Sequence, residues 1–288
     1  MSKTPVSTGI VYFDGQWHLD NPMVIGPATN AVWMASAVFD GARAFDGVAP
    51  DLDLHCARAI RSAQLVGLEP AISAEEIEAL AWEGISRMPA DKALYVCPQF
   101  YGETGFISPD PESTRFALII RESPLPPPDG FSACLSSFRR PATDMAPTEA
   151  KASSLYPNVA RALREAKSRN FDTAVMLDPE DYVAEFAYAN LFMVKDGTVH
   201  TPLPNGTFLN GITRQRVIKL LLGAGVPVVE RSITFDELAG SEELFGTGNY
   251  YKVAPCSRLE NQTFEFGPIA QKARELYFNF ARTCTKSG

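Results

Sequence analysis

"SPLPPPDG", residues 123–130, divides this chain, because four prolines and a glycine in eight residues cannot form a regular helix or strand. A segment of this composition is typical of a linker. The chain has 288 residues, which is long enough for two domains of ordinary size. We therefore expect a small α+β domain at residues 1–122, a Pro-rich linker at 123–130 and a larger domain at 131–288.

The N-terminal side of the linker carries strand and helix signals. "IVYFDGQWHL" alternates about Asp14-Gly15, as the two strands of an opening hairpin do. Apolar residues at helical spacing follow, and Ser73 with Glu76 forms a capping box at the start of a second helix. The expected strands are the hairpin at 10–19 and the stretches 93–101 and 114–122, and the expected helices are 52–68 and 73–88.

The C-terminal side mixes strands and helices along the chain. Pro157 is acceptable in the first turn of a helix, and a later helix closes on Gly225. We expect helices at 156–170 and 211–225 and strands within 131–138, 173–178, 183–202 and 226–238. The chain as a whole is therefore expected to combine α+β and α/β organisation.

Composition excludes several classes of function. The formal net charge is −8 and the basic residues are dispersed, which argues against a nucleic-acid or anionic-membrane surface. No apolar run reaches the roughly 18 residues of a membrane helix, and the N-terminus lacks the blocks of an export signal, so we expect a cytoplasmic location. Five scattered cysteines and three histidines indicate reduced thiols, no metal site and little material for a Ser/His/Asp triad.

One lysine stands out in "TEAKASSLYPN", residues 148–158. Lys151 lies among small and polar residues, and Tyr156 follows five positions later. Seven of the nine lysines fall in termini, turns or amphipathic helices, where an amine is solvated. Lys151 and Lys252 remain as candidates for a chemical role.

Other features of the sequence share one chemical need. Gly211, Ile212 and Thr213 precede a helix whose first N–H groups suit an anion such as phosphate, and Arg58 offers a second phosphate ligand. Glu185 lies in an apolar run and needs a cationic or protonated partner. Each feature also has an ordinary structural explanation. Residues 211–213 could begin an ordinary capped helix, Arg58 could be an exposed helix arginine, and Glu185 could be a strand acid that faces water. An amine, a phosphate anchor and an acid for a ring nitrogen together match what pyridoxal 5'-phosphate requires.

The sequence resembles the class IV, or fold-type IV, pyridoxal-phosphate aminotransferases, and among them the branched-chain amino acid aminotransferases. The resemblance implies the two-domain D-amino-acid-aminotransferase-like fold, a homodimer, and transfer of an amino group from an amino acid to a 2-oxo acid. It is carried by an ordered set of fragments: "YFDGQW", "VFDGARAF", "HCARAIRSA", "ALYVCPQF", "EAKASSLYPN", "VAEFAYANLFMVKDG", "LNGITR" and "ELFGTGNYYKVAP".

The resemblance also implies roles for single residues. Lys151 is the expected Schiff-base lysine, Tyr156 the partner of the cofactor's phenolic oxygen, and Glu185 the partner of its pyridine nitrogen. The other expected cofactor-binding residues are Arg58, Asn190, Leu209, Gly211, Ile212, Thr213, Thr247 and Asn249.

The substrate pocket departs from the family pattern. Cys97 in "YVC" stands where the family has an arginine that holds the side-chain carboxylate of glutamate, so use of glutamate and 2-oxoglutarate is in doubt. Arg43, Arg139 and Lys252 are candidates for an alternative carboxylate ligand. The expected substrate-pocket residues are Met34, Phe39, Arg43, Tyr95, Cys97, Tyr250 and Tyr251.

Three other activities fit the same sequence. An (R)-amine or D-amino-acid transaminase uses the same fold, and an aminodeoxychorismate lyase uses the same lysine for elimination. A non-enzyme that only binds the cofactor is the third. The leading expectation is a transaminase whose partners are a small amino donor and an oxo acid acceptor.

Overall fold

The computed structural model describes residues 9–19 and 21–286 of the chain. Contacts between residues divide it into two compact units, and the division falls inside the Pro-rich segment. The first unit comprises Met1–Leu125, Ala150–Ser154 and Ala281–Gly288, and the second comprises Pro126–Glu149 and Leu155–Phe280. Two short segments from the later part of the chain thus belong to the first unit, which a division at the linker alone does not anticipate.

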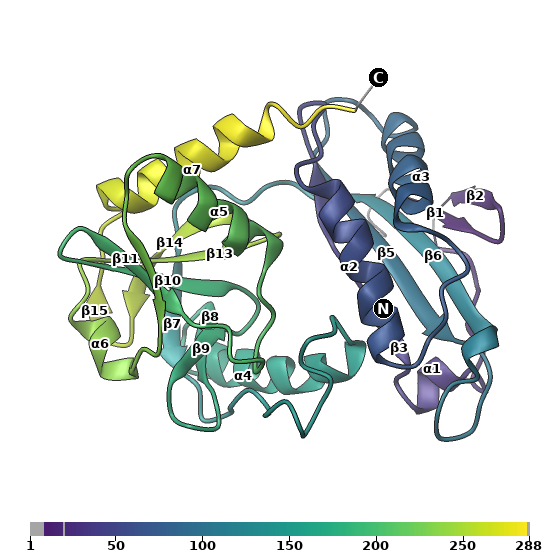
Figure 1. Cartoon of the computed structure of the whole chain (residues 1–288), viewed down its shortest axis with the longest axis horizontal. Helices are drawn as coiled ribbons and strands as arrows, with labels where there is room; N and C mark the ends of the chain where they lie inside the picture. Colours follow the sequence, from purple (N-terminus) through teal and green to yellow (C-terminus); the bar gives the residue numbers. More distant parts are fainter. Residues whose placement is uncertain (1–8, 20, 287–288) are drawn as a thin grey trace. The chain divides into compact units, whose positions relative to one another are not determined.

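The first unit is an antiparallel sheet with helices packed against it (Figure 1). Its strands are β1 (Gly9–Phe13), β2 (Gln16–Leu19), β3 (Ala37–Phe39), β4 (Ala42–Ala44), β5 (Leu94–Gly102) and β6 (Thr114–Glu122). Its helices are α1 (Asn30–Trp33), α2 (Leu52–Leu65), α3 (Ala74–Ser86) and the 3-10 turn η1 (Pro111–Ser113). The strand order is β2-β1-β6-β5-β3, with β4 also paired to β5, so β3 lies at one end of the sheet.

Local sequence signals account for the turn between β1 and β2 and for the start of α3. Asp14 and Gly15 both have positive φ, 50° and 79°, which is the backbone of the tight turn that a two-residue hairpin requires. Ser73 Oγ accepts from the Glu76 N–H at 3.2 Å, and the Glu76 carboxylate accepts from the Ser73 N–H at 2.7 Å. The predicted hairpin and capping box are both confirmed.

The second unit is built on a mixed sheet. Its strands are β7 (Phe131–Leu135), β8 (Thr173–Leu177), β9 (Val183–Phe186), β10 (Asn190–Lys195), β11 (Thr198–Pro202), β12 (Val228–Arg231), β13 (Glu243–Gly248), β14 (Lys252–Leu259) and β15 (Gln262–Thr263). The order is β12-β11-β10-β13-β14-β7-β8-β9, with β15 on β14. Pairs β11–β12, β14–β7 and β7–β8 are parallel and the others are antiparallel, so the expected mixture of organisations is confirmed.

Among the described residues of the second unit, the predicted helices at 156–170 and 211–225 are present, and two further helices were not predicted. The helices are α4 (Tyr156–Ser168), α5 (Ile212–Gly223), α6 (Phe235–Ala239) and α7 (Pro268–Ala281), and the 3-10 turn η2 (Ser153–Leu155) precedes α4. The sequence placed a strand over the whole of 226–238, but its last part is the helix α6. A capping box between Thr234 and Glu237 starts that helix, and this signal was missed.

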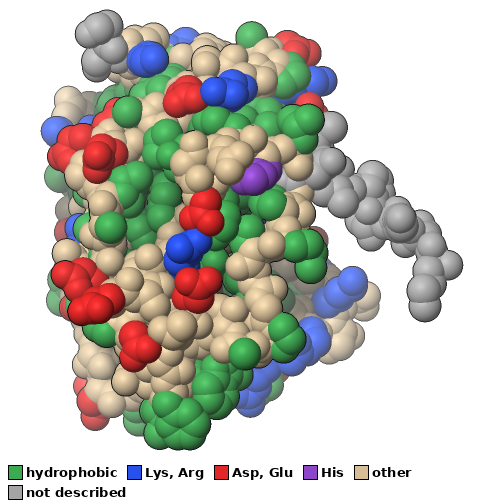
Figure 2. All heavy atoms as spheres, turned by 90° about the vertical axis from the view of Figure 1, so that its right-hand side faces the viewer, with side chains coloured by type: hydrophobic (Ala, Val, Ile, Leu, Met, Phe, Trp, Pro, Cys, Tyr) green, Lys and Arg blue, Asp and Glu red, His purple; other side chains and the backbone are tan. Residues whose placement is uncertain are grey.

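The surface shows no dominance of one charge on the face seen in Figure 2. Hydrophobic side chains on that face are interspersed with acidic and basic ones. Among the residues that the structure describes, no helix combines the length and apolar character needed to cross a membrane.

Candidate active site

Backbone contacts within the first unit fix the position of Lys151. The Phe39 N–H donates to the Lys151 carbonyl at 3.1 Å, and the Lys151 N–H donates to Ser62 Oγ on α2 at 3.1 Å. Ala152 forms an isolated antiparallel bridge with β3, which extends the sheet at its end strand. Ala150 and Ala152 are buried, so only small side chains fit on either side of the lysine. These pairings order a stretch that has no periodicity of its own.

The Lys151 amine lies at the face of the first-unit sheet that Phe39 presents. Its Nζ is 5.0 Å from the centre of the Phe39 ring. Residues directly opposite in an antiparallel pair share a face, as do alternate residues along one strand. By the strand register, this face carries Phe39 of β3, Arg43 of β4 and Tyr95, Cys97 and Gln99 of β5.

Cys97 makes the middle of this face neutral. Its side chain is buried, and burial raises the pKa of the thiol to about 11, against hydrogen bonds from Tyr95 and Gln99 that lower it. The thiol is therefore protonated near neutral pH. A carboxylate that reached this position would meet no positive charge from Cys97.

Arg43 has a structural use close to this face. It is buried, and its Nη1 donates to Ser123 Oγ at 2.5 Å while its Nη2 donates to the Pro124 carbonyl at 3.0 Å. The guanidinium therefore fastens the start of the Pro-rich segment. Of the other candidate carboxylate ligands, Arg139 is half-exposed and pairs with Asp181. The terminal nitrogens of both guanidinium groups thus already have partners within their own units.

Arg58 is buried and held by an acid that the sequence analysis did not single out. Asp40 is fully buried and accepts a fork from Arg58, with Nε at 2.6 Å and Nη2 at 2.9 Å. His55 Nδ1 lies 2.7 Å from the same carboxylate. Burial by itself raises the pKa of Asp40, but Arg58 and His55 outweigh it and hold that pKa well below its usual range. The alternative of an exposed helix arginine is wrong, because Asp40 orients this guanidinium inside the unit.

The second unit places Glu185 on β9 in a buried polar cluster. Arg140 Nε lies 3.4 Å from Glu185 Oε1, and Asn190 Nδ2 donates to Glu185 Oε2 at 3.3 Å. Glu185 is buried, with only 7% of the residue exposed, so the alternative of a strand acid facing water is wrong. The expected cationic partner exists within the protein, and the sequence analysis missed it because Arg140 precedes Glu185 by several elements.

Asn190 also holds the loop that leads into α5. Its Nδ2 donates to the Leu209 carbonyl at 2.9 Å. A side chain at Gly211 would place its Cβ 2.2 Å from Asn190 Oδ1, so only glycine allows this approach. Gly211 is the N-cap of α5, and no side chain caps that helix, which contradicts the ordinary capped-helix alternative. The first-turn N–H groups of Ile212 and Thr213 are thus presented by a loop that Asn190 fixes.

Thr247 lies opposite Asn190 on β13 and is completely buried. Within the described part of the chain, its hydroxyl has no hydrogen-bond partner. Buried hydroxyls in folded proteins are nearly always bonded, so an orphan of this kind calls for an explanation. An anion bound at the start of α5 would provide an acceptor for it.

The turn after β13 carries Tyr250 and Tyr251, two of the expected substrate-pocket residues. The Tyr251 ring packs in the hydrophobic core of the second unit, stacked on Phe131 with 5.4 Å between ring centres. Tyr250 is 54% exposed. Lys252 is buried with φ of 63°, and its Nζ donates to Asn249 Oδ1 at 2.8 Å. Lys252 thus orients a side chain of the turn.

The remaining site residues occupy element ends. Tyr156 is the first residue of α4 and is partly buried. Met34 follows α1 and is exposed. The first unit therefore gathers Lys151 with the expected pocket residues of β3 and β5, and the second unit gathers Glu185 and Asn190 with the start of α5.

Comparison with known proteins gives one consistent result. The family model for amino-transferase class IV matches residues 37–259. A branched-chain-amino-acid aminotransferase of Pseudomonas aeruginosa is 30% identical, over 97% of this chain and 95% of its own length. A Brucella abortus aminotransferase solved with the co-factor PLP is 46% identical with a TM-score of 0.94, covering 96% of this chain and 99% of that one. A branched-chain aminotransferase of Thermoproteus uzoniensis, solved with norvaline, is 30% identical with a TM-score of 0.89, covering 96% of each chain.

Replacing Asp40 by asparagine tests the buried cluster around Arg58. We expect Asp40→Asn to lower the free energy of unfolding by about 3 kcal/mol at pH 7, because it leaves a buried guanidinium without its anion. The folded-state pKa of Asp40 is depressed, so its contribution is present above the unfolded pKa of about 4 and is lost as the pH falls below it. The difference between the proteins in urea unfolding should therefore shrink from pH 6 towards pH 2.

Asp14→Asn is the matched control. Asp14 pairs with Arg115 at the surface, where such pairs contribute about 0–1 kcal/mol. An equal loss in both variants, or a difference that does not change with pH, would show that the Asp40 cluster lacks the role described.

Proposed function

Since the chain belongs to the class IV aminotransferases, we propose that it is a pyridoxal-phosphate-dependent transaminase acting between a branched-chain-like amino acid and a 2-oxo acid. The main support for a pyridoxal-phosphate cofactor is the geometry at the start of α5. There, uncapped N–H groups, a loop fixed by Asn190 and the orphan hydroxyl of Thr247 suit a phosphate group. Glu185 supplies a buried carboxylate in the same unit, as a protonated ring nitrogen needs.

The residues of this chain would then divide the work. When bound, the cofactor supplies an electron-withdrawing ring that stabilises negative charge at the substrate α-carbon. Lys151 Nζ holds the cofactor covalently before substrate arrives, and afterwards moves the proton at that α-carbon. By the family resemblance, Glu185 would hold the pyridine nitrogen and Tyr156 the phenolic oxygen. The residues that would hold the phosphate are Arg58, Ile212, Thr213, Thr247 and Asn249, and Leu209 would contact the ring.

The substrate preference follows from Cys97. A neutral thiol on the sheet face beside Tyr95 favours an apolar or uncharged substrate side chain over the second carboxylate of glutamate. A branched-chain-like amino donor fits this environment. We also retain the sequence-based expectation of a cytoplasmic enzyme with small-molecule substrates.

A second copy of the chain is the partner we propose for an exposed apolar surface on the first unit. Trp33 of α1 and Phe106 contact edge to face with 5.6 Å between ring centres, and Ile107 is 73% exposed beside them. Asn30 Nδ2 donates to the Gly105 and Phe106 carbonyls, so α1 and the loop form one surface. An apolar patch of this kind is typical of an interaction site.

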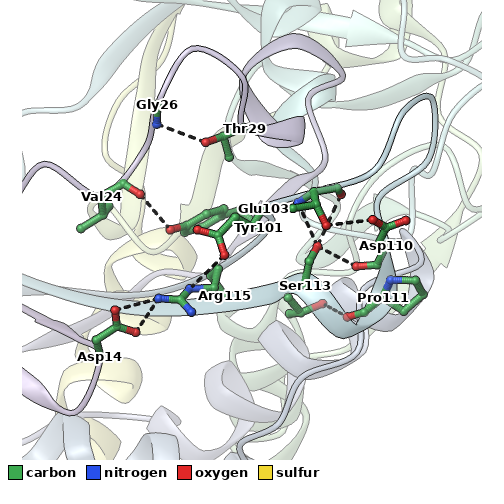
Figure 3. Close-up of polar contacts among 12 residues, drawn as sticks. Asp14, Val24, Gly26, Thr29, Tyr101, Glu103, Asp110, Pro111, Ser113 and Arg115 are labelled. Atoms are coloured by element: carbon green, nitrogen blue, oxygen red, sulfur yellow. Dashed lines mark hydrogen bonds and ion pairs between the residues drawn. The ribbon is translucent and has the colours of Figure 1, made fainter.

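Polar contacts hold the loop that carries Phe106 (Figure 3). Ser113 Oγ donates to the Asp110 carbonyl at 2.7 Å, and the Thr104 hydroxyl donates to the Asp110 carboxylate at 2.8 Å. Phe106 is therefore presented by a pre-formed loop, which lowers the entropy lost when two copies associate. The family resemblance implies a homodimer, which favours a second copy of this chain as the partner at this surface.

Peptide mapping tests the role of Lys151. After reconstitution with pyridoxal phosphate and borohydride reduction, the labelled peptide should contain residue 151. Lys151→Ala should abolish labelling and lower the transamination rate by at least roughly a hundredfold, because both covalent attachment and proton transfer are lost. Lys252→Gln is the control for labelling alone and should keep the label at residue 151, since Lys252 is the other lysine that the sequence leaves unassigned. A label on Lys252, or none in the wild type, would refute the proposal.

A half-reaction screen tests the substrate class. We expect L-leucine to bleach the cofactor absorption faster than L-glutamate, D-alanine or an (R)-amine. Cys97→Arg should raise the rate with L-glutamate relative to L-leucine roughly tenfold, because it adds a charge that pairs with the second carboxylate. Cys97→Ser should leave the ratio unchanged. Faster bleaching by D-alanine than by L-leucine would replace the branched-chain assignment with a D-amino-acid one.

Light scattering after size-exclusion chromatography tests the homodimer. The wild type should have about twice the chain mass of 31.4 kDa. Phe106→Ser with Ile107→Ser should shift the mass towards the monomer at low concentration, because it removes apolar area from the surface. Leu19→Ser, at a residue that is 84% exposed on β2, is the control and should remain dimeric. A monomeric wild type would exclude the second copy as partner.

A further inference from the structure

Glu185 is held from both of its carboxylate oxygens by side chains of the second unit. Arg140 Nε lies 3.4 Å from Oε1, and Asn190 Nδ2 donates to Oε2 at 3.3 Å. Both partners are buried, Arg140 with 5% and Asn190 with 6% of its surface exposed. The carboxylate orientation is thus set within the protein.

Arg140 is itself fixed. Its backbone N–H donates to the Leu177 carbonyl at 2.8 Å, at the end of β8. Its Nε also donates to the Thr207 carbonyl at 3.1 Å. Thr207 in turn donates to Asn205, and Asn205 donates to the Asp178 carboxylate at 2.7 Å. The guanidinium is therefore placed by β8 and by a loop that is tied to the same strand end.

A buried carboxylate without a cation nearby takes up a proton instead of bearing an unpaired charge. An arginine side chain stays charged at every pH that a folded protein meets. Arg140 therefore favours the ionised form of Glu185. The contact is through Nε alone at 3.4 Å, and a carboxylate can accept about four hydrogen bonds, so this pairing does not saturate the acceptor.

We propose that Arg140 is a positioning residue that keeps Glu185 ionised and oriented toward the pyridine nitrogen of the cofactor. This rests on the proposed function. An ionised carboxylate leaves the shared proton on the ring nitrogen, where it strengthens electron withdrawal. A protonated Glu185 could not accept that hydrogen bond, so Arg140 acts on the cofactor through Glu185.

Cofactor titration of the apo-protein gives a direct test. Arg140→Gln should weaken the binding of pyridoxal phosphate roughly ten- to a hundredfold, by analogy with the loss seen when the side chain that orients a metal-binding residue is removed. On acidification, the variant should lose cofactor binding at a higher pH than the wild type does. The reason is that Glu185 takes up a proton more readily without the Arg140 charge. Arg140→Lys retains the charge and should restore most of both properties.

A double-mutant cycle with Glu185→Gln separates this role from a purely structural one. If Arg140 acts through Glu185, adding Arg140→Gln to Glu185→Gln should change cofactor affinity less than twofold. The double variant removes both buried charges, so it also provides a folded protein if Arg140→Gln alone unfolds. Urea unfolding of each apo-protein measures the stability effect independently.

Arg169→Gln is the matched control. Arg169 forms a fork with Glu260 in the same unit and should leave cofactor affinity and its pH profile unchanged. Wild-type pH dependence in Arg140→Gln, or an undiminished effect in the Glu185→Gln background, would overturn the role of Arg140 alone. Absence of cofactor binding by the wild type would overturn both this inference and the proposed function.

Discussion

The pairing of residues 150–152 with β3 is the constraint on which the candidate site depends. It uses peptide groups: the Phe39 N–H and the Lys151 carbonyl, with the Lys151 N–H directed to Ser62. Because peptide groups make these bonds, they fix the main chain at Lys151 without involving its amine. The pairing also explains why small residues flank the lysine, since the segment lies against a strand and a helix. An amine on a loose loop would lack this fixed starting point.

In the second unit, Asn190 has a corresponding part. The Asn190 amide donates to Glu185 and to the Leu209 carbonyl. Its oxygen also lies so close to Gly211 that a Cβ at that position would clash with it. The residues proposed for the ring nitrogen and for the phosphate are therefore fixed by a shared neighbour. Networks of this kind have coupled energetics, since moving one member leaves others unsatisfied. In each unit, a set of residues held in fixed positions by hydrogen bonds, rather than any single side chain, suits the binding of a flat, charged cofactor.

Sequence reasoning succeeded where the signal is local. Asp14-Gly15 and the Ser73 capping box depend on neighbouring residues, so their structures were predicted. Glu185 was correctly expected to be buried and to need a partner. Arg140 as that partner was not predictable, because sheet register and a distant loop bring the two together. The same holds for Asp40 beneath Arg58.

Other differences have the same physical origin. Tyr251 lies in a turn, and its ring is buried by packing against Phe131 and other core residues that are distant in the sequence. The segment 150–154 joins the first unit through strand pairing that no contiguous division of the sequence contains. The chemical roles assigned to Lys151 and Tyr156 come from family resemblance and remain predictions, because contacts within a protein do not reveal a reaction.

Burial of the thiols affects how readily this protein reacts with oxidants. Burial raises the pKa of Cys97 to about 11 and that of Cys256 to about 12. The thiolate is the form that reacts with oxidants and alkylating reagents, and at neutral pH these two residues hold almost none of it. A sulfur atom close to the proposed reaction centre is thereby chemically quiet. Cys97 is therefore a poor target for oxidants and alkylating reagents at neutral pH.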